Sequence, residues 1–471
     1  MESPRCRPVA AILACMEDRR RTCTMFAIVT LACAFGSLSQ TVTNSMLGGI
    51  RASFGTDQSM GQWLTTIYML SIGITVPLVA HLSRKFSLRA LVLISLAFSV
   101  AGSLVGALAP NFVVLCLGRV LQAIGTGITL PILQTIAMTR FPPGQNATAM
   151  GIAGIAMGFA PNIGPLIGGV LVDTLGWRSF FWMFLAGVAV LGAATLLLVR
   201  RNEHKASDAH LDFASFMLST LGFGGLLLGF SNAANMALAE PAVWLPLLVG
   251  AVCLVWFVVR QRRIEFPLIS MDIFRSRVYV VSFVAQNCLF ASFMGITLIL
   301  PLFVMGPLQL TPVDAGMVFL PVTVLAVVFN PLAGILCDKV GARPVIVGAA
   351  ACLFVGAAAM AFIDDGTPLW LVTVWQVVRG IGVSSLIGPL NSWGLSGLDH
   401  RYMVDASAFF TTTRQVSASL GTALMMFLLA IFGATSTVGA DAVLGFHLAF
   451  GLSAAFSLAV LACAVLFVRS K

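Results

Sequence analysis

Charged residues are scarce in this chain of 471 residues, and acidic ones are the scarcest. Asp, Glu, Lys and Arg together make up 10% of the sequence, with 18 acidic against 27 basic residues, whereas a soluble globular protein carries about 25% charged residues. Hydrophobic residues make up 59% of the chain, and its mean hydropathy is +0.98. This composition excludes a water-soluble domain and indicates a protein that folds in lipid.

Signatures of enzymes and metal proteins are also missing. The ten cysteines have no paired metal-ligand spacing, and we expect them to be free thiols packed in helices. The sequence has no nucleotide-binding loop, metal cluster or nucleophile constellation, so we expect no cofactor, no metal and no enzymatic activity. The net charge of +9 is explained by membrane topology and anionic lipid, and we expect no nucleic-acid partner.

The chain has instead a series of apolar runs of about 20 residues, the length of a membrane-spanning helix. Short polar, Gly, Pro or basic clusters separate these runs. The sequence therefore predicts an all-α polytopic membrane protein with fourteen transmembrane helices. We place them at 24–47, 61–82, 89–109, 112–137, 145–172, 178–199, 212–231, 242–260, 278–305, 312–336, 344–363, 368–392, 404–432 and 445–468.

The distribution of Lys and Arg supports this topology. With both termini in the cytoplasm, 22 of the 27 basic residues lie on the cytoplasmic side, only Arg51 and Arg178 lie outside, and three lie within spans. This asymmetry follows the positive-inside rule. The first apolar run is too long for a secretory signal, so we expect an uncleaved first span. We place the chain in the plasma (inner) membrane as a multi-pass protein with both termini cytoplasmic.

Weak internal similarity divides the chain into two halves. Val120–Gly125 resembles Val377–Gly382, and the loop Ala80–Arg89 resembles Gly334–Arg343. Two six-helix halves that face each other across a central site are common in secondary transporters. We predict a cytoplasmic N-tail at 1–23, a six-helix bundle at 24–199, a two-helix insertion at 212–260, a cytoplasmic linker at 261–277 and a second six-helix bundle at 278–468.

The linker is the most basic connection in the chain. It contains Pro267 and apolar residues between its charges, which suits an amphipathic segment on the inner leaflet. A plain connecting segment is an equal alternative.

Three arginines lie deep in apolar runs. Arg119, Arg379 and Arg414 each stand about 10 to 16 Å from the nearest end of their spans, and no Asp or Glu lies comparably deep. An unpartnered charge at such depth costs several kcal/mol, and intramembrane charges usually face a cavity. The sequence thus predicts a polar pathway with a positive bias.

Five motifs occur in a specific order and spacing. They are Gln62-Trp63, Gly118-Arg119-x-x-Gln122-x-x-Gly125, Pro161-x-x-Gly164-Pro165-x-x-Gly168-Gly169, Gly334-x-x-x-Asp338-Lys339-x-Gly341-x-Arg343 and Arg414-Gln415-x-x-x-x-Leu420-Gly421. Through them nearly the whole chain resembles the major facilitator superfamily, and within it the fourteen-helix drug/proton antiporters. The resemblance implies helices arranged as 6+2+6 and proton-coupled export of amphipathic small molecules by alternating access.

Two of these motifs contain candidate gating residues. Gly154 and Gly158, and likewise Gly164 and Gly168, are i, i+4 pairs that leave one helix stripe without side chains, and Pro165 permits a bend before Gly169. The resemblance implies that this stripe is a seam between the two halves, and ordinary helix packing is the alternative.

The second gating candidate is the loop with Asp338, Lys339, Gly341 and Arg343. Its carboxylate can meet a helix N-terminus or a basic neighbour, which would close the cytoplasmic side in one state. A stabilising salt bridge within the loop is the alternative. In the first half Arg84 occupies the position of Asp338, so we expect that this latch has lost its acid and that gating is asymmetric.

A second group of residues is predicted to act in coupling. The antiporters have an aspartate in the first span, and here Ser39 takes its place in Leu38-Ser39-Gln40-Thr41-Val42-Thr43-Asn44. The resemblance implies that Arg119 helps to pass protons, and we expect neutral acceptors such as Ser39, Gln40 or Asn44 to bind it. Asp314, at the outer end of its span, is the best remaining acid for coupling. The full set of transport and coupling candidates is Arg119, Gln122, Arg379, Arg414, Gln415 and Asp314.

Polar side chains at depth also predict a substrate cavity, because they need partners there. The candidates are Ser39, Gln40, Thr41, Asn44, Gln286 and Asn287. Without a fixed negative charge, this cavity should favour neutral or anionic substrates over cations. We expect a monomer whose partners are a small-molecule substrate, membrane lipid and protons. A uniporter, a specific metabolite or peptide exporter without first-span proton coupling, and a non-transporting membrane sensor remain alternatives.

Overall fold

The computed structural model of this chain describes residues 6–56, 58–142, 144–199, 212–234, 236, 239–264, 267–432 and 440–468. All regular structure in these residues is helical. The first nine helices are α1 (Cys6–Phe54), α2 (Gln58–Lys85), α3 (Leu88–Ala107), α4 (Phe112–Thr139), α5 (Asn146–Gly154), the π-helical turn η1 (Ile155–Phe159), α6 (Ala160–Leu175), α7 (Arg178–Leu198) and α8 (Phe213–Ala233). The rest are α9 (Pro241–Gln261), η2 (Met271–Arg275), α10 (Arg277–Met305), α11 (Pro312–Met317), α12 (Leu320–Val340), α13 (Ala342–Met360), α14 (Leu369–Ser396), η3 (His400–Tyr402), α15 (Met403–Phe432) and α16 (Ala440–Phe467).

Several helices begin at capping residues. Ser87 accepts a hydrogen bond from the Ala90 amide at the start of α3, and Asn111 accepts one from the Val114 amide at the start of α4. These side chains satisfy amide groups that have no partner within the helix. Thirteen helices in the described part of the chain are long and apolar enough to cross a membrane.

One predicted span differs from the observed helices, and the predicted N-tail is largely helical. The run predicted at 145–172 is helical from Asn146 to Leu175 but is divided by the turn η1, and it is not among the thirteen. The N-tail predicted at 1–23 is helical from Cys6 onward, since α1 continues through Arg19–Arg21. Arginine is a good helix former, so a basic cluster does not end a helix.

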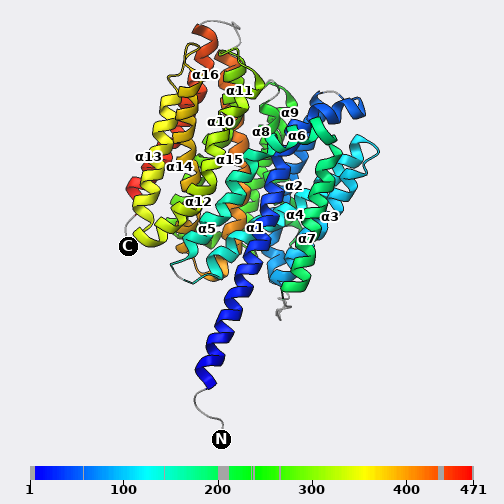
Figure 1. Cartoon of the computed structure of the whole chain (residues 1–471), viewed down its shortest axis with the longest axis vertical. Helices are drawn as coiled ribbons and strands as arrows, with labels where there is room; N and C mark the ends of the chain where they lie inside the picture. The colour runs from blue at the N-terminus through cyan, green and yellow to red at the C-terminus, as the bar shows by residue number, and fades with distance from the viewer. Residues whose placement is uncertain are drawn as a thin grey trace.

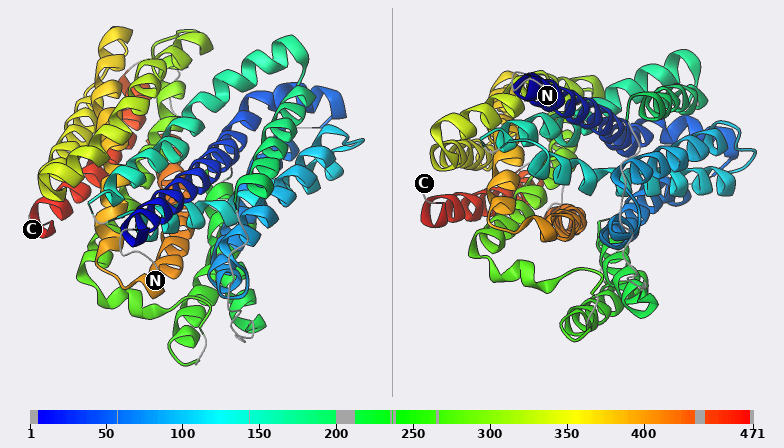
Figure 2. Two further views of the ribbon diagram at one scale, coloured as in Figure 1. Left: turned by 60° about the horizontal axis from the view of Figure 1, so that its bottom comes forward. Right: turned by 90° about the horizontal axis from the view of Figure 1, so that it is seen from below.

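The helices form two bundles. Helices α1–α4, α6 and α7 pack on one another in the first bundle, to which α5 connects, and α10–α16 form the second bundle. Figure 1 shows the N-terminal part of α1 projecting from one end of the molecule, which we call the lower face; the opposite end is the upper face. Figure 2 shows the α8–α9 pair at the edge, with the linker running from it along the lower face to the second bundle.

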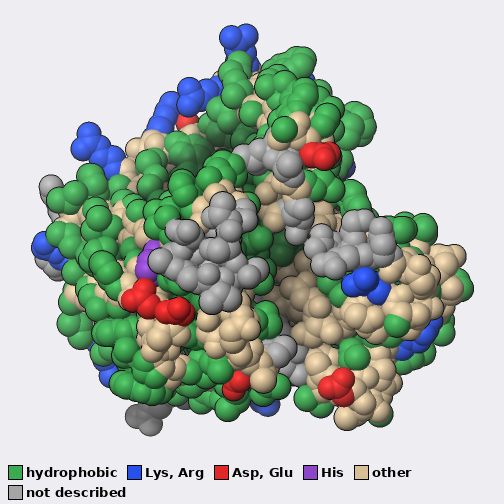
Figure 3. Space-filling view, turned by 90° about the horizontal axis from the view of Figure 1, so that it is seen from above, with side chains coloured by type: hydrophobic (Ala, Val, Ile, Leu, Met, Phe, Trp, Pro, Cys, Tyr) green, Lys and Arg blue, Asp and Glu red, His purple; other side chains and the backbone are tan. Residues whose placement is uncertain are grey.

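The two bundles contact each other through a few helices. Helix α5 packs on α12 and α14, and α2 and α4 pack on α15. Helix α8 lies against both α2 and α15 and so covers part of this boundary. The upper face is hollowed near its centre (Figure 3).

Part of the linker packs on the protein. Leu268, Ile269 and Ile273 are buried in the protein. The apolar residues of the linker face the bundles, while Arg262, Arg263 and Arg275 remain exposed. The linker is thus anchored to the protein, and its place on the inner leaflet stays a prediction.

Candidate functional site

Arg119 is completely buried in the first bundle and bonded to neutral groups. Its Nη1 donates to Oγ of Ser39 at 2.7 Å and to Oε1 of Gln122 at 2.9 Å, and its Nη2 donates to the Ser39 carbonyl at 2.9 Å. The guanidinium also lies 4.1 Å from the ring centre of Tyr68, a cation–π distance. The expected contact between Arg119 and Ser39 is thus present.

The other predicted first-span residues do not bond to Arg119. Asn44 is exposed and accepts a hydrogen bond from the Thr65 hydroxyl at 2.9 Å. The Thr41 hydroxyl donates to the Leu38 carbonyl within α1, and Gln40 is half-buried. A helix turns about 100° per residue, so only Ser39 of this run points at Arg119.

Arg414 lies where the two bundles meet. Its Nη1 donates to the thioether of Met157 in the first bundle at 3.4 Å, and its guanidinium lies 4.5 Å from the ring centre of Phe290. Beside it Gln134 of α4 donates to Met157 at 3.7 Å and to the Thr411 hydroxyl at 3.4 Å. Sequence reasoning missed Gln134 and Met157, because neither stands out among buried residues without the fold.

The remaining polar candidates of the second bundle bridge helices. Gln286 donates to the Ile387 carbonyl at 3.4 Å, and Asn287 accepts a hydrogen bond from the Ser417 hydroxyl at 2.7 Å. Gln415 is half-buried on α15. These contacts tie α10 to α14 and α15.

Arg379 is buried without the partners that Arg119 has. Its Nε and Nη2 have no hydrogen-bond partner among the described residues, and neither has Oε1 of Gln376, one turn earlier on α14. In α4 the order is reversed, with Arg119 preceding Gln122, and there the two side chains bond. Arg119 is therefore bonded to the glutamine one turn away, whereas no described hydrogen bond joins Arg379 to Gln376.

The predicted glycine stripe meets different neighbours along its length. A side chain at Gly164 or Gly168 would collide with Thr41, Val42 or Ser45 of α1, so these glycines pack within the first bundle. Gly169 faces open space, and the side chain of Pro165 lies outside the described residues.

Glycines between the bundles include Gly151 and Gly154 of α5 and Gly158, which faces Ile387 of α14. An added carbon at Gly151 would lie 2.6 Å from the Asn330 carbonyl, and one at Gly154 would lie 2.6 Å from Oδ1 of Asn330. The predicted stripe therefore meets the other bundle at Gly154 and Gly158, while Gly164 and Gly168, farther along the span, pack on α1.

Asp338 joins the bundles at the lower face. Its carboxylate accepts hydrogen bonds from the Ala147 and Thr148 amides at 3.2 and 2.7 Å and from the Thr148 hydroxyl at 2.6 Å. The acid thus caps the N-terminus of α5 in the other bundle, where the helix dipole favours negative charge. Gly341 turns the chain with a φ of 101°, while Lys339 and Arg343 are exposed.

The equivalent loop of the first bundle also reaches across. Nη2 of Arg84 bonds to both carboxylate oxygens of Asp405, at 3.3 and 3.0 Å. The expectation that this latch has lost its acid is wrong, because α15 supplies the acid. An acid in the first turn of the span that also contains Arg414 was the signal that sequence reasoning overlooked. We call the Asp338 and Asp405 contacts the lower gate.

A family model described as the Major Facilitator Superfamily matches residues 29–422. The chain belongs to the major facilitator superfamily. This is the superfamily that the motifs predicted, and its members are membrane transporters and not enzymes. The chain is therefore a multi-pass membrane transporter.

Individual relatives carry names of transport and drug resistance. The chain is 34% identical over 434 residues to the uncharacterized MFS-type transporter YcnB of Bacillus subtilis, and the alignment covers 91% of this chain and 92% of that protein. It is 31% identical over 404 residues to the lincomycin resistance protein LmrB of Listeria monocytogenes, covering 86% of each.

A solved structure shares the fold. The crystal structure of a human organic anion transporter aligns with a TM-score of 0.67 at 14% identity, over 93% of this chain and 99% of that chain. At this identity the likeness shows the common major facilitator fold alone.

Asp314 forms part of a helix cap in this transporter. Its carboxylate accepts from the Thr311 amide and hydroxyl at 3.0 and 2.7 Å, and its own amide donates to the Thr311 hydroxyl at 3.2 Å. This capping box starts α11 near the upper face. No described contact joins Asp314 to a buried arginine.

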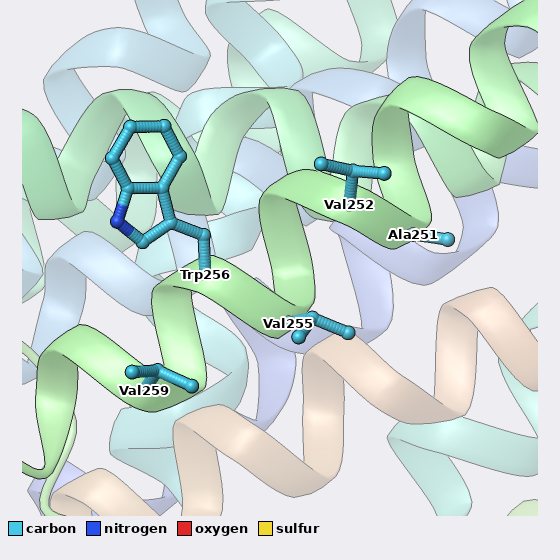
Figure 4. A pocket seen from close by; sticks show the side chains of 5 residues that line it. All are labelled: Ala251, Val252, Val255, Trp256 and Val259. Atoms are coloured by element: carbon cyan, nitrogen blue, oxygen red, sulfur yellow. The ribbon is translucent and has the colours of Figure 1, made fainter.

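A shallow groove on the transporter's α9 is separate from these residues. Figure 4 shows Ala251, Val252, Val255, Trp256 and Val259 on this one helix. All five side chains are largely apolar, as suits a surface that faces lipid tails. The groove offers none of the polar groups that a transport site needs.

Proposed function

We propose that this protein is a secondary active transporter that exports amphipathic small molecules from the cytoplasm by alternating access. It has fourteen spans arranged as 6+2+6, with the lower face and both termini on the cytoplasmic side of the plasma membrane. The helical run from Asn146 to Leu175 would be the fourteenth span, since its 30 residues exceed the length that a bilayer requires. The positive-inside asymmetry supports this orientation.

The observation that carries the proposal is the closed lower gate beneath a hollowed upper face. Asp338 caps α5 and Arg84 pairs with Asp405, so both boundaries between the bundles are tied at the lower end, while the upper face is hollowed. Alternating access needs two alternative closures of this kind. The arrangement corresponds to the outward-facing state of an exporter.

Substrate preference follows from the charges at the centre. Arg414 lies between the bundles, and no acid among the described residues pairs with it. In a poorly hydrated cavity this charge repels cations and favours neutral or anionic acceptors. The name of the lincomycin resistance relative supports antibiotics and similar amphipathic compounds as candidates.

Proton coupling belongs to this proposal by family resemblance, and a uniporter or a specific metabolite exporter is its main rival. A non-transporting sensor is less well supported, because a sensor does not need two intact gate contacts. Asp314, engaged in a capping box, is a weaker coupling candidate than its position in the sequence suggested.

The test is uptake into everted vesicles with and without a proton gradient. We expect ATP-independent accumulation of neutral or anionic dyes that collapses when a protonophore is added. Uptake that only equilibrates would support the uniporter, and no uptake of dyes or antibiotics would contradict the exporter.

A further inference from the structure

Arg414 bonds to an unusually weak acceptor. In the described residues its only hydrogen-bond acceptor is the Met157 sulfur, at 3.4 Å. A thioether accepts hydrogen bonds poorly, whereas a carbonyl or carboxylate oxygen binds a guanidinium strongly. Arg414 is 7% exposed, so the site is nearly but not fully sealed.

The local fold places the Met157 sulfur at the boundary between the two bundles. Met157 is the central residue of the π-helical turn η1, which inserts an extra residue into the helical path. Gln134 also donates to the same sulfur, and its own Oε1 has no partner. The Met157 thioether thus accepts hydrogen bonds from Gln134 of the first bundle and from Arg414 of the second, while Oε1 of Gln134 has no hydrogen-bond partner among the described residues.

We propose that Met157 holds the place of a substrate acceptor at Arg414. This inference rests on the proposed function and names the substrate class. Transported compounds would carry a carboxylate or carbonyl group beside an aromatic or apolar body. The oxygen displaces the sulfur from Arg414, and the apolar body lies near Phe290, whose ring already contacts the guanidinium.

Displacement has a mechanical consequence. Met157 belongs to the first bundle and Arg414 to the second, so their bond ties the bundles at the level of the site. When the substrate takes over Arg414, this tie is lost. Substrate binding and movement of the bundles are then linked through one exchange of acceptors.

The test compares two substitutions that change only the competing acceptor. Met157→Leu keeps size and apolarity but removes the acceptor, and Met157→Gln supplies a stronger one. Met138→Leu is the control, because Met138 is equally buried and makes no bond to Arg414. The probes are a fluorescein-type carboxylate dye, its neutral methyl ester and a tetraarylphosphonium cation.

For the carboxylate dye we expect Met157→Leu to lower KM and Met157→Gln to raise it, each by about three- to tenfold. The ester should shift less, and the control should not shift. Shifts in the same direction for both variants, or none, would reduce Met157 to a packing residue. If wild-type protein transports none of the probes, the exporter proposal fails first, and dye binding to purified protein in nanodiscs then tests the acceptor exchange separately.

An independent set of contacts involves the linker at the lower gate. Nη1 of Arg84 donates to the Pro267 carbonyl at 2.9 Å, and the Ser270 amide donates to Oδ2 of Asp405 at 2.9 Å. The linker backbone therefore bonds to both partners of an ion pair that joins the two bundles.

The linker is in turn fixed to the α8–α9 pair. The Ile269 amide donates to Oε1 of Gln261 at 3.2 Å, and Nε2 of Gln261 donates to the Ser215 hydroxyl at 2.6 Å. Ser215 bonds to Asp212, which pairs with Arg260 at 2.8 Å. Arg260 lowers the pKa of the Asp212 carboxyl to about 2, so this pair is ionised at neutral pH.

We infer that the α8–α9 pair and the linker form a clasp on the lower gate. A continuous chain of bonds runs from the base of the pair through the linker to Arg84 and Asp405. Helix α8 reinforces it, since Phe223 packs edge-on against Phe409 of α15 at 6.1 Å. The linker bonds to Arg84 of the first bundle and Asp405 of the second, so opening of the lower face must release at least one of these two bonds.

Hydrogen exchange of the protein in nanodiscs measures how readily the backbone amides of the linker, such as those of Ile269 and Ser270, lose their hydrogen bonds. Ser270→Pro removes the amide donor at a residue whose φ of −69° suits proline. Gln261→Leu removes the anchor at the other end, and Gln261→Glu retains an acceptor for Ile269. Arg262→Leu is the matched control, because Arg262 is the exposed neighbour of Gln261.

We expect Ser270→Pro and Gln261→Leu to speed exchange at 267–273 and at the start of α15 by about tenfold or more, and to change the transport rate. The control should behave like wild type, whereas Gln261→Glu, which keeps the acceptor for Ile269 but loses the Nε2 donor to Ser215, should lie between wild type and Gln261→Leu. Faster exchange confined to 267–273, with α15 and transport unchanged, would show that the linker is no part of the gate.

Discussion

Nη2 of Arg84 lies 3.0 Å from Oδ2 of Asp405 across the boundary between the two bundles. The pair reverses the arrangement at the other boundary, where the loop contributes the acid, Asp338, and the neighbouring helix contributes its N-terminus. The two halves therefore close the lower face with the same topology but with opposite placement of charge.

This relationship predicts similar sensitivity at both contacts. Asp405→Asn, Arg84→Gln and Asp338→Asn should each weaken closure of the lower face. The Asp405 side chain is 4% exposed and Arg84 is 30% exposed, so screening lowers the cost to about 1 to 2 kcal/mol, or about tenfold in closure. Reaction rates of a cysteine reporter at the lower face would measure it.

The exchanged pair Arg84→Asp with Asp405→Arg is the control for charge pairing. It should recover part of the closure but not all, because the Ser270 amide loses its acceptor. Strong loss in Asp338→Asn with normal closure in both single variants of the pair would restore the asymmetric gate expected from the loops alone.

A second prediction separates the glycines of the α5–α6 span. Gly151→Ala should hold the bundles apart, since an added carbon would lie 2.6 Å from the Asn330 carbonyl of α12. Backbone cannot move aside as a side chain can, so transport should fall with little change in thermal stability. Gly164→Ala instead meets α1 within the same bundle, and we expect a lower melting temperature. Transport assays and melting curves of both purified variants would distinguish the two roles.

A third prediction concerns the missing acid of the first span. Ser39→Asp would put a carboxylate against Arg119, because the Ser39 hydroxyl lies 2.7 Å from Nη1. The added acid removes the local excess of positive charge and gives the site a group that can carry a proton. We expect proton-driven export of permanent cations to appear or increase, measured with a phosphonium dye in everted vesicles.

The matched control for that variant is Ser39→Asn, which has similar size and no charge. Strong export of permanent cations by the wild-type protein, unchanged by Ser39→Asp, would contradict this account of the missing aspartate.

A fourth prediction tests the orientation. Asp365 and Arg263 are both exposed, at the upper and lower faces. In a background without native cysteines, a membrane-impermeant thiol reagent added to intact cells should label Asp365→Cys and spare Arg263→Cys. Permeabilised cells provide the control, and labelling of Arg263→Cys in intact cells would reverse the topology.

The helices and their approximate ends were predictable from the sequence. A bilayer demands long apolar helices, so hydrophobic runs mark them, as at 278–305, where α10 spans Arg277–Met305. The contact between Arg119 and Ser39 was also predictable, because a buried guanidinium needs acceptors and the first span offers few. The turn η1 was not, since a π-turn depends on packing and leaves no periodic signal.

Pairings between distant segments required the tertiary structure. Arg84 and Asp405 are 321 positions apart, and neither local sequence indicates the other residue as its partner. The same holds for Met157 with Arg414 and for Gly151 with Asn330. Local composition determines whether a segment enters the membrane, because that free energy sums over its own residues. Which helix faces meet depends on the packing of all helices together, and that packing places the gate and the central site.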